Sequence, residues 1–427
     1  MNLENKRKIR VELLQPGVFV QLDGKWFSHP FILSKFKLKN WDQIEILAKS
    51  GIKEVMWIPE KSDCLPKEKV ESQRSEPQTA PQEKVDPSVE VMWRIKKEQM
   101  EHLKQIHENM RRCSRNYDRI SQNVPDLMNK MMQGSKEAIA NAKETVEGMV
   151  DAFLGETDAI VHLINIKEKD EGIYHHSLNV SVLGIMLGKK AKLTASEMHE
   201  LGIAALFHDI GKNQIEKKVL KRKGPLTKAE LAIIKLHPQY GFDILAKSGI
   251  RDVGVLQAVK EHHELYNGTG YPSGLKGEKI SKLARIITII DAYDNLCNNL
   301  DNEKRMTPYE ALSHIYTKLQ HWIDVDLFSV FIRSMGIYPP GTVVQLSNGE
   351  TGIVITINPN NPLKPSLLIY DPNIPKEEAL ICEMEENDDI AIEKSIHIDE
   401  LSDQMRLYLS ATTHVTYFVE KRVVNGK

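Results

Sequence analysis

The chain has 427 residues, of which 41% are hydrophobic and 27% are charged, and its formal net charge at pH 7 is −2. A chain of this length exceeds one ordinary core and predicts about three domains. The small net charge excludes the global basic field that would favour DNA or RNA as a partner. No apolar stretch reaches the ~20 residues of a membrane span. The absence of a signal-peptide pattern and of CxxC cysteine pairs predicts a cytoplasmic protein with no membrane partner.

Residues 1–60 have the pattern of a small α+β module. The segment GVFVQLDGKWF predicts two strands joined at the Asp23-Gly24 turn. The segment NWDQIEILAKSG predicts a helix stopped by Gly51, and IKEVMWI predicts a strand. Residues 61–90 are rich in Pro, Glu, Lys, Gln and Ser, a composition too polar to bury a core, so we expect a disordered linker there.

Residues 91–166 have a long helical pattern that predicts a region connecting the module to the rest of the chain. Pro125 and Gly134 are its main breakers. Its many basic side chains are typical of a solvated face, but they also fit a face that binds other signalling proteins. A homodimer formed through this region is a further expectation.

Two domains of different texture follow. Residues 167–335 predict helix upon helix with short loops, whereas residues 336–427 predict a β-rich domain. The latter has a hairpin about Asn348-Gly349 and further strands in SLLIYD and HVTYFVEKRVV. The predicted fold is multidomain: an all-α domain with a small N-terminal α+β module and a small C-terminal β-rich domain.

The segment LFHDIGK, at positions 206–212, raises a question about buried polar groups. It ends a helix that opens with a capping box of Thr194 and Glu197 and is apolar on nearly every side. His208 and Asp209 at its inner end are costly unless a partner satisfies them. That partner is either a neighbouring protein group or a metal ion. We expect Gly211 to end the helix.

Other His and Asp residues of the all-α domain favour the metal. Helical spacing places His262, His263 and Asp291 on apolar faces, although a lone His there is more often an ordinary core residue. His237 precedes Pro238, which favours a helix boundary. For the adjacent pair in YHHS, periodicity does not decide which His points inward.

Several inward His and Asp groups are hard to satisfy by core hydrogen bonds alone, and a shared cation would satisfy them together. Imidazole and carboxylate without thiolate indicate Fe, Mn, Co, Ni or Zn. The ligands are too numerous for one four-coordinate site, which favours two metal ions bridged by a carboxylate.

These motifs resemble a known family. The segments HDIGK, KLHPQYGFDIL, HHELYNGTGYPSGL and RIITIIDAYDNL are similar to those of the HD-GYP family of bacterial cyclic dinucleotide phosphodiesterases, a branch of the HD superfamily. The likeness runs from about Tyr174 to Leu312. The N-terminal module and the YPPGTVVQLSNGETGIV segment resemble the flanking regions of one HD-GYP subgroup. The resemblance implies an HD-type helical catalytic domain over residues 167–335.

The resemblance also implies roles for individual residues. Asp209 would be the bridging and catalytic carboxylate, and Lys212 a catalytic residue that contacts the substrate phosphate. Two divalent transition-metal ions, with Fe or Mn favoured, are implied as cofactors. The Gly270-Tyr271-Pro272 loop would shape the substrate pocket. The implied metal ligands are His176, chosen over His175 because it holds the His-Ser position, His208, Asp209, His237, His262, His263 and Asp291.

The implied activity is metal-dependent hydrolysis of a cyclic dinucleotide, with cyclic di-GMP as the substrate. Hydrolysis of 3′,3′-cyclic GMP-AMP is the alternative within the class. Two alternatives come from other classes: a signalling module that binds the dinucleotide with weak or no turnover, and a partner-binding protein that works through its long helical region.

Three positions depart from the family pattern. Gly172 stands where some members carry a glutamate that binds a third metal, which favours two metals here. Asn267 stands where an aspartate usually opens the GYP loop. Leu300 stands where an arginine commonly binds substrate, and Lys304 and Arg305 are the candidates to replace it.

Overall fold

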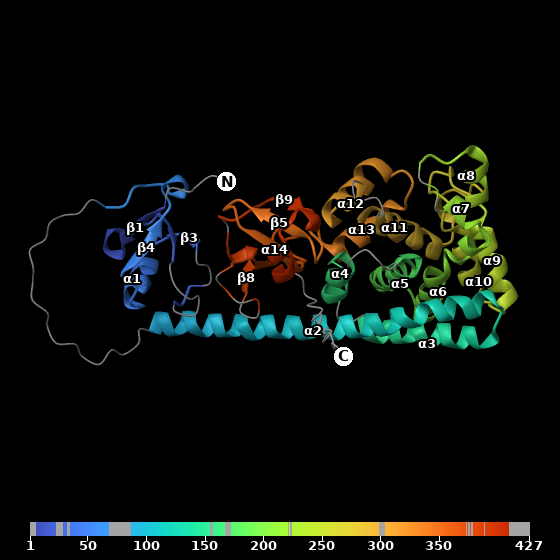
Figure 1. Ribbon diagram of the computed structural model, residues 1–427, viewed down its shortest axis with the longest axis horizontal. Helices are drawn as coiled ribbons and strands as arrows, with labels where there is room; N and C mark the ends of the chain where they lie inside the picture. The colour runs from blue at the N-terminus through green and yellow to red at the C-terminus, as the bar shows by residue number, and fades with distance from the viewer. Residues whose placement is uncertain are drawn as a thin grey trace, which may run out of the picture. The chain divides into compact units, whose positions relative to one another are not determined.

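The computed structural model divides into two compact units, whose elements Figure 1 labels. One unit contains residues 1–108 and 343–395, and the other contains residues 109–342 and 396–427. This division differs from the five segments expected above, whose limits remain a prediction. The structure describes residues 6–22, 29–31, 35–67, 87–153, 157–166, 172–220, 222, 224–298, 304–372, 374, 376, 379–387 and 389–409.

The described residues of the N-terminal module form a four-stranded antiparallel sheet with one α-helix, which confirms the predicted α+β class, although β1 and β3 were not predicted. The sheet order is β1-β4-β2-β3, and apolar side chains of α1 and of the sheet share one core. The helix begins after Asn40, whose side chain accepts a bond from the Gln43 N–H, and it ends before Gly51, at φ +77°. The elements are β1 (Arg7–Arg10), β2 (Phe19–Gln21), β3 (Lys35–Lys37), α1 (Trp41–Lys49) and β4 (Glu54–Trp57).

The predicted turn at Asp23-Gly24 lies outside the described residues. Strand β2 pairs with β3, in the register Val20 to Phe36. The module ends at a short segment up to residue 67, and most of the predicted linker also lies outside the described residues.

The β-rich region that follows the helices contains a five-stranded sheet in the order β8-β7-β6-β5-β9, in which β5, β6 and β7 were predicted and β8 and β9 were not. Strands β5 and β6 pair antiparallel around Gly349, whose φ is +81°, which confirms the predicted hairpin. SLLIYD contains β7, while HVTYFVEKRVV lies outside the described residues. The elements are β5 (Val343–Leu346), β6 (Thr351–Thr356), β7 (Ser366–Ile369), β8 (Leu380–Glu383), β9 (Ile392–Ile396) and α14 (Asp403–Leu409).

The predicted long helical region consists of α2 (Pro87–Met132), α3 (Lys136–Phe153) and α4 (Thr157–Ile166). Pro125 is accommodated inside α2, and Gly134, at φ +72°, separates α2 from α3. An apolar stripe of α2, at alternating spacings of three and four, is buried within the chain, so a second copy would need another face. The stripe contains Met110, Cys113, Tyr117, Ile120, Val124, Leu127 and Met131.

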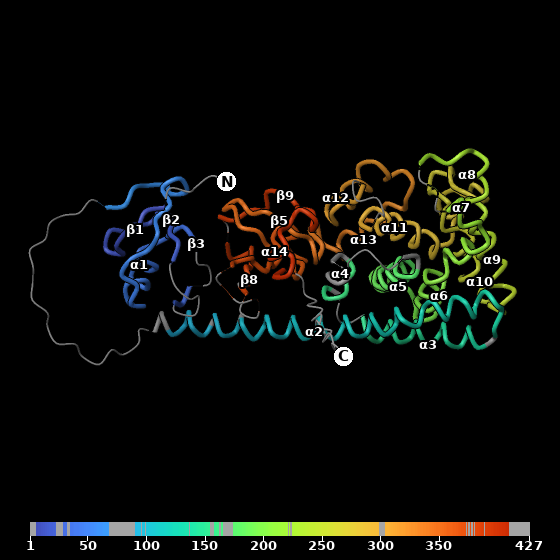
Figure 2. The backbone as a smooth tube through the Cα atoms, in the orientation of Figure 1, coloured from blue at the N-terminus to red at the C-terminus, as the bar shows by residue number. Residues whose placement is uncertain are grey.

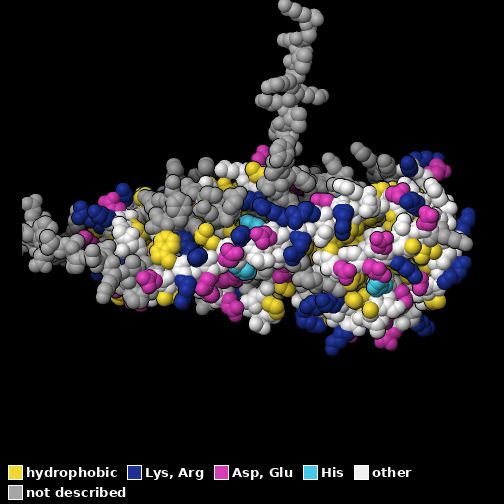
Figure 3. Space-filling model, turned by 90° about the horizontal axis from the view of Figure 1, so that it is seen from below, with side chains coloured by type: hydrophobic (Ala, Val, Ile, Leu, Met, Phe, Trp, Pro, Cys, Tyr) yellow, Lys and Arg dark blue, Asp and Glu magenta, His cyan; other side chains and the backbone are white. Residues whose placement is uncertain are grey.

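The charged face of α2 is solvated. Arg94 pairs with Glu98, and Lys130 pairs with Asp126, each one helical turn apart and exposed. On the face that Figure 3 displays, basic and acidic side chains are interspersed. The exposed ion pairs of Arg94 and Lys130 match the solvated-face interpretation of α2.

The rest of the helical unit surrounds a core shared by α5, α6, α10 and α11, and the backbone of α3 runs alongside α5 and α6 (Figure 2). Capping boxes begin α6, α8 and α12. None of the described helices has the length and apolar composition needed to span a bilayer. The helices are α5 (Gly172–Lys190), α6 (Ala195–Phe207), α7 (Lys217–Leu220), α8 (Lys228–Ile234), α9 (His237–Ser248), α10 (Val253–Glu261), α11 (Lys282–Cys297), α12 (Pro308–His314) and α13 (Val325–Met335).

Candidate metal centre

The structure brings all seven predicted metal ligands together in the helical unit. Their ligand atoms include two groups able to hold a metal ion, and Asp209 belongs to both. One group is Asp209, His237, His262 and His263, and the other is His176, His208 and Asp209. His176 lies on α5, His208 and Asp209 follow α6, His237 begins α9, His262 and His263 follow α10, and Asp291 lies on α11.

The Asp209 carboxylate faces both groups, with one oxygen toward each. Its Oδ1 lies 3.3 Å from His237 Nε2 and 3.8 Å from His262 Nε2. Its Oδ2 lies 3.5 Å from His208 Nε2 and 3.9 Å from His176 Nε2. This is the arrangement that a carboxylate bridging two cations requires.

Three of the imidazoles are oriented by backbone carbonyls of the helix that precedes each of them. His208, His237 and His262 each have Nδ1 at 2.7 Å from the carbonyl oxygen of the residue three positions earlier. The carbonyl can only accept, so Nδ1 carries the proton and donates it. Each Nε2 is then the basic atom, directed into the cluster, as in metal-binding histidines generally.

The fourth imidazole, His176, is oriented by a carboxylate instead. Its Nδ1 lies 2.7 Å from Asp294 Oδ2, and its Nε2 lies 3.1 Å from Asp291 Oδ1. Asp294 also accepts from the Asn179 amide at 3.0 Å, and the Tyr117 hydroxyl of α2 donates to that amide's oxygen at 2.6 Å. A polar chain thus connects α2 to the cluster.

The adjacent His175 points away from the cluster. Its two ring nitrogens lie 3.3 Å from the Tyr117 hydroxyl and 3.2 Å from the Ser121 hydroxyl, both on α2. Periodicity left the choice between His175 and His176 open, and the position assigned through the family resemblance is the one that enters the cluster.

Buried atoms without partners indicate that a cation fits this site. Among the described residues, His176 Nε2, His208 Nε2 and Asp209 Oδ1 are buried and make no hydrogen bond. His237 Nε2 and His262 Nε2 lie 3.1 Å apart although both are basic nitrogens. Leaving such groups unsatisfied would cost about 1–3 kcal/mol each, and a shared metal ion removes that cost.

Electrostatics favour the deprotonated ligands that metals need. Burial alone would raise the pKa of Asp209, but His208 and Lys212 hold it well below its usual range. Burial, reinforced by neighbouring imidazoles, lowers the pKa of His262 far below its usual value. Burial also lowers the pKa of His263 to about 4. These two imidazoles are therefore neutral at pH 7.

Around His176, on the other side of the Asp209 carboxylate, neighbouring carboxylates favour positive charge. Burial alone would lower the pKa of His176, but the Asp291 and Asp294 carboxylates raise it well above its usual value. Carboxylates placed in this way stabilise either a proton or a metal cation between themselves and the imidazole.

The structure corrects the predicted role of Gly211. The α-helix ends at Phe207, and Gly211 lies inside a 3₁₀ turn from Ile210 to Gln214. A Cβ on Gly211 would lie 2.0 Å from the His237 carbonyl oxygen, so the glycine permits close packing against α9. Adjacent Lys212 forms an ion pair with Asp209, and 30% of its side chain is exposed. Its ammonium therefore lies between the cluster and open space.

The Gly270-Tyr271-Pro272 loop lies against the cluster. The Tyr271 ring stacks on His263 with centroids 4.9 Å apart. Gly270 is required by its surroundings, because a Cβ there would lie 2.2 Å from the Leu265 nitrogen. Buried Glu264 accepts from the backbone N–H groups of Ser273 and Leu275 at 2.6 and 2.9 Å, which fixes the loop.

Asn267, Lys304 and Arg305 are the other residues predicted to lie on the substrate side. Asn267 accepts from the Thr269 N–H at 3.1 Å, so it can close the loop as an aspartate would. The Arg305 carbonyl accepts a hydrogen bond from the His397 ring at 2.7 Å. Asp399 is a charged neighbour of the Arg305 guanidinium. Among the described residues, no hydrogen bond or ion pair joins Arg305 to the metal cluster. Lys304 precedes it, and Leu300 lies outside the described residues.

Two positioning residues were not identified from the sequence. Asp294 lies in DAYDNL, about one helical turn after Asp291. Its position on the same buried helix face as Asp291 is the signal that could have identified it. Glu264 ends KEHHE, but its role depends on a loop that returns to it nine and eleven residues later, which no local pattern reveals.

Comparisons with known proteins identify the family. Residues 161–327 match the family described as HD domain, and residues 6–142 match a domain of unknown function, DUF3391. A cyclic di-GMP phosphodiesterase of Pseudomonas aeruginosa is 30% identical over 367 residues, covering 85% of this chain and 85% of that protein. The chain belongs to the HD-GYP family of cyclic dinucleotide phosphodiesterases.

Other relatives are similar over a smaller part of the chain. A cyclic di-GMP phosphodiesterase response regulator of Xanthomonas campestris is 32% identical over 39% of this chain and 45% of its own length. A 3′3′-cGAMP-specific phosphodiesterase of Vibrio cholerae is 31% identical over 38% of this chain and 35% of its own length.

The DUF3391 match spans both the N-terminal module and α2. These two parts are joined by a hydrogen bond from the buried Lys96 ammonium of α2 to the His29 carbonyl, at 2.7 Å.

Proposed function

We propose that this HD-GYP protein hydrolyses cyclic di-GMP with two divalent metal ions. The observation that carries the proposal is Asp209, whose two oxygens face two separate groups of imidazole nitrogens. His237, His262 and His263 would hold one ion. His176 and His208, with Asp291 beside them, would hold the other.

The residues divide the work between metal binding and substrate binding. When bound, the two ions supply Lewis-acid charge and lower the pKa of water, so that phosphodiester hydrolysis can proceed at neutral pH. Iron or manganese suits the imidazole and carboxylate donors. Lys212, part-exposed beside Asp209, would bind a phosphate oxygen of the substrate and stabilise the additional negative charge of the transition state.

The GYP loop would form the wall of the substrate pocket. Tyr271 keeps its ring against His263, and burial raises the pKa of its hydroxyl. That hydroxyl is therefore protonated at neutral pH and able to donate a hydrogen bond. Lys235, whose ammonium lies 5.1 Å from the centre of the Tyr271 ring, adds positive charge at this wall.

A second candidate substrate is 3′,3′-cyclic GMP-AMP. The relative from Vibrio cholerae is named for that substrate, and Leu300 removes the arginine expected to contact cyclic di-GMP. An adenine-containing dinucleotide would be the better substrate if the pocket has adapted to that loss.

One experiment tests the proposal. Protein loaded anaerobically with Fe(II) or Mn(II) is incubated with each cyclic dinucleotide, and the products are identified by chromatography and mass spectrometry. We expect linear dinucleotide or mononucleotide from cyclic di-GMP, and no product from Asp209→Ala. Asp243→Ala, an exposed carboxylate on α9, is the matched control and should retain activity. Binding without turnover under all metal conditions would contradict the proposal and favour a non-catalytic signalling module.

A further inference from the structure

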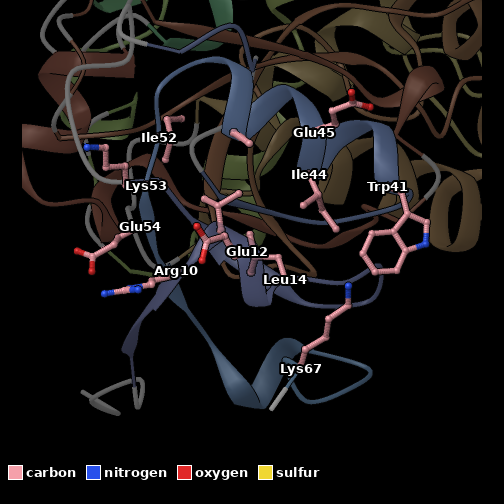
Figure 4. A pocket seen from close by; sticks show the side chains of 12 residues that line it. Arg10, Glu12, Leu14, Trp41, Ile44, Glu45, Ile52, Lys53, Glu54 and Lys67 are labelled. Atoms are coloured by element: carbon pink, nitrogen blue, oxygen red, sulfur yellow. The ribbon is translucent and has the colours of Figure 1, made fainter. Parts of the chain in front are cut away.

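The N-terminal module contains a cavity that the catalytic function does not use. Its volume is about 740 Å³, within the range of small-molecule sites. Figure 4 shows Trp41 and Lys67 at one end and Arg10 and Lys53 toward the other, with Leu14 between them. The cavity therefore has an apolar floor and a cation at each end.

The charges of the lining leave the cations available to a ligand. Arg10, Lys53 and Lys67 form no ion pair with any described residue. Two lining carboxylates are engaged outside the cavity, because Glu54 binds Lys8 at 2.9 Å and Glu45 binds Lys49 at 2.7 Å. Glu12 is the third carboxylate of the lining. The lining thus carries three cations and three carboxylates, and two of the carboxylates are already paired with lysines that do not line the cavity.

The aromatic end is held in place by the backbone. Trp41, the first residue of α1, is 52% exposed, which is unusual for so large an apolar side chain. The Lys67 ammonium lies 4.1 Å from the centre of its ring. The Lys67 N–H donates to the Leu13 carbonyl at 2.8 Å, and the Gln15 amide donates to the Leu65 carbonyl at 2.6 Å. These bonds fix the segment that carries Lys67 beside Trp41.

We propose that this cavity binds a nucleotide-class ligand, with its phosphate at Arg10 and Lys53 and its base against Trp41. Guanidinium and ammonium groups bind phosphate by charge-assisted hydrogen bonds. A base stacked on an aromatic ring gains ~1–3 kcal/mol with little dependence on its identity. The apolar floor between the two ends suits the flat body of such a ligand. The module would then be a nucleotide sensor, independent of the chemistry at the metal cluster.

The test is titration calorimetry on the full-length protein after chelation of its metals, so that the catalytic site lacks the cations that would bind phosphate. The probes are GMP, AMP and UMP, with guanosine and inorganic phosphate as partial ligands. We expect one site per chain for the mononucleotides and weaker binding of both partial ligands. Arg10→Gln and Trp41→Leu should each weaken GMP binding about tenfold.

Arg7→Gln is the matched control, because Arg7 lies on the same strand but its guanidinium lies over Trp57 instead of lining the cavity. It should bind GMP as the wild type does. Three results would overturn the proposal: no binding of any mononucleotide, equal weakening by Arg7→Gln and Arg10→Gln, or inorganic phosphate binding as tightly as GMP. Thermal melting of each variant confirms its fold, and Arg10→Gln decides the matter if Trp41→Leu is unstable.

Discussion

The metal side and the substrate side of the catalytic site are built in different ways. On the metal side, buried imidazoles are fixed by carbonyls of their own helices, as for His208, or by a buried carboxylate, as for His176. On the substrate side, the Lys212 side chain is part-exposed. The GYP loop is held by Glu264, which lies before the loop and accepts from the Ser273 N–H. We therefore expect metal binding to be preorganised by the helices, and substrate affinity to depend on a few part-exposed side chains and one loop. Substitutions on the two sides should therefore have separable effects.

The largest effect is expected from Asp209→Ala. Both metal groups share this carboxylate, so its loss should remove most of the bound metal and reduce activity by more than about a thousandfold. Elemental analysis and product formation measure the two effects. If the variant kept its full metal content, Asp209 would not be the bridging ligand and the metal side would be assembled differently.

Lys212→Ala should break the link between metal content and activity. Lys212 contributes charge without being a ligand, so we expect retained metal and a kcat lower by roughly 10²–10³-fold. Lys218→Ala, which removes an exposed lysine paired with Glu216, is the control and should leave kcat unchanged. Loss of metal from Lys212→Ala would instead assign the lysine to the metal side.

The metal ligands were predicted from the family resemblance, after helical spacing had indicated only that several His and Asp side chains point inward, and their local geometry agrees with that prediction. A His at the end of an apolar helix bonds the carbonyl three residues earlier, so its direction follows from the helix itself. The substrate side depends on loop closure, such as Glu264 reaching Ser273, and Gly211 proved to be a packing residue because α9 approaches it. These contacts are set by tertiary structure, which no local spacing reveals.

The fold shows the same division between local and long-range determinants. The α1 helix and the hairpin at Gly349 follow from caps and turn residues and were predicted. The pairing of β2 with β3 was not, because the turn signal at Asp23-Gly24 predicted the residues directly after that turn as the partner strand, whereas β3 begins at Lys35. The cavity of the module was also not predicted, since Arg10, Trp41 and Lys67 come from three separate segments.

Asp294→Asn should test how strongly the metal side depends on support around its ligands. Asp294 accepts a hydrogen bond from His176 Nδ1. Among the described residues it makes no hydrogen bond or ion pair with another predicted metal ligand. Such support is worth about 10–100-fold in metal affinity or activity. His175→Ala is the neighbouring control: it removes bonds to α2 and should lower stability by about 1 kcal/mol while metal affinity stays at the wild-type value. Metal titration and thermal melting separate the two outcomes.

The smallest effect is expected on the substrate side, at Leu300. Leucine cannot donate to a phosphate or stack on guanine as the family's usual arginine does. Leu300→Arg should therefore lower KM for cyclic di-GMP about tenfold, with kcat nearly unchanged, because the added contact is common to ground and transition states. Steady-state kinetics on cyclic di-GMP and on 3′,3′-cyclic GMP-AMP measure the effect. An unchanged KM for cyclic di-GMP, with 3′,3′-cyclic GMP-AMP as the better substrate of the wild type, would mean that the pocket is already adapted to adenine. Metal content should be the same in both proteins, since neither substrate affinity nor base preference requires a change among the seven ligands.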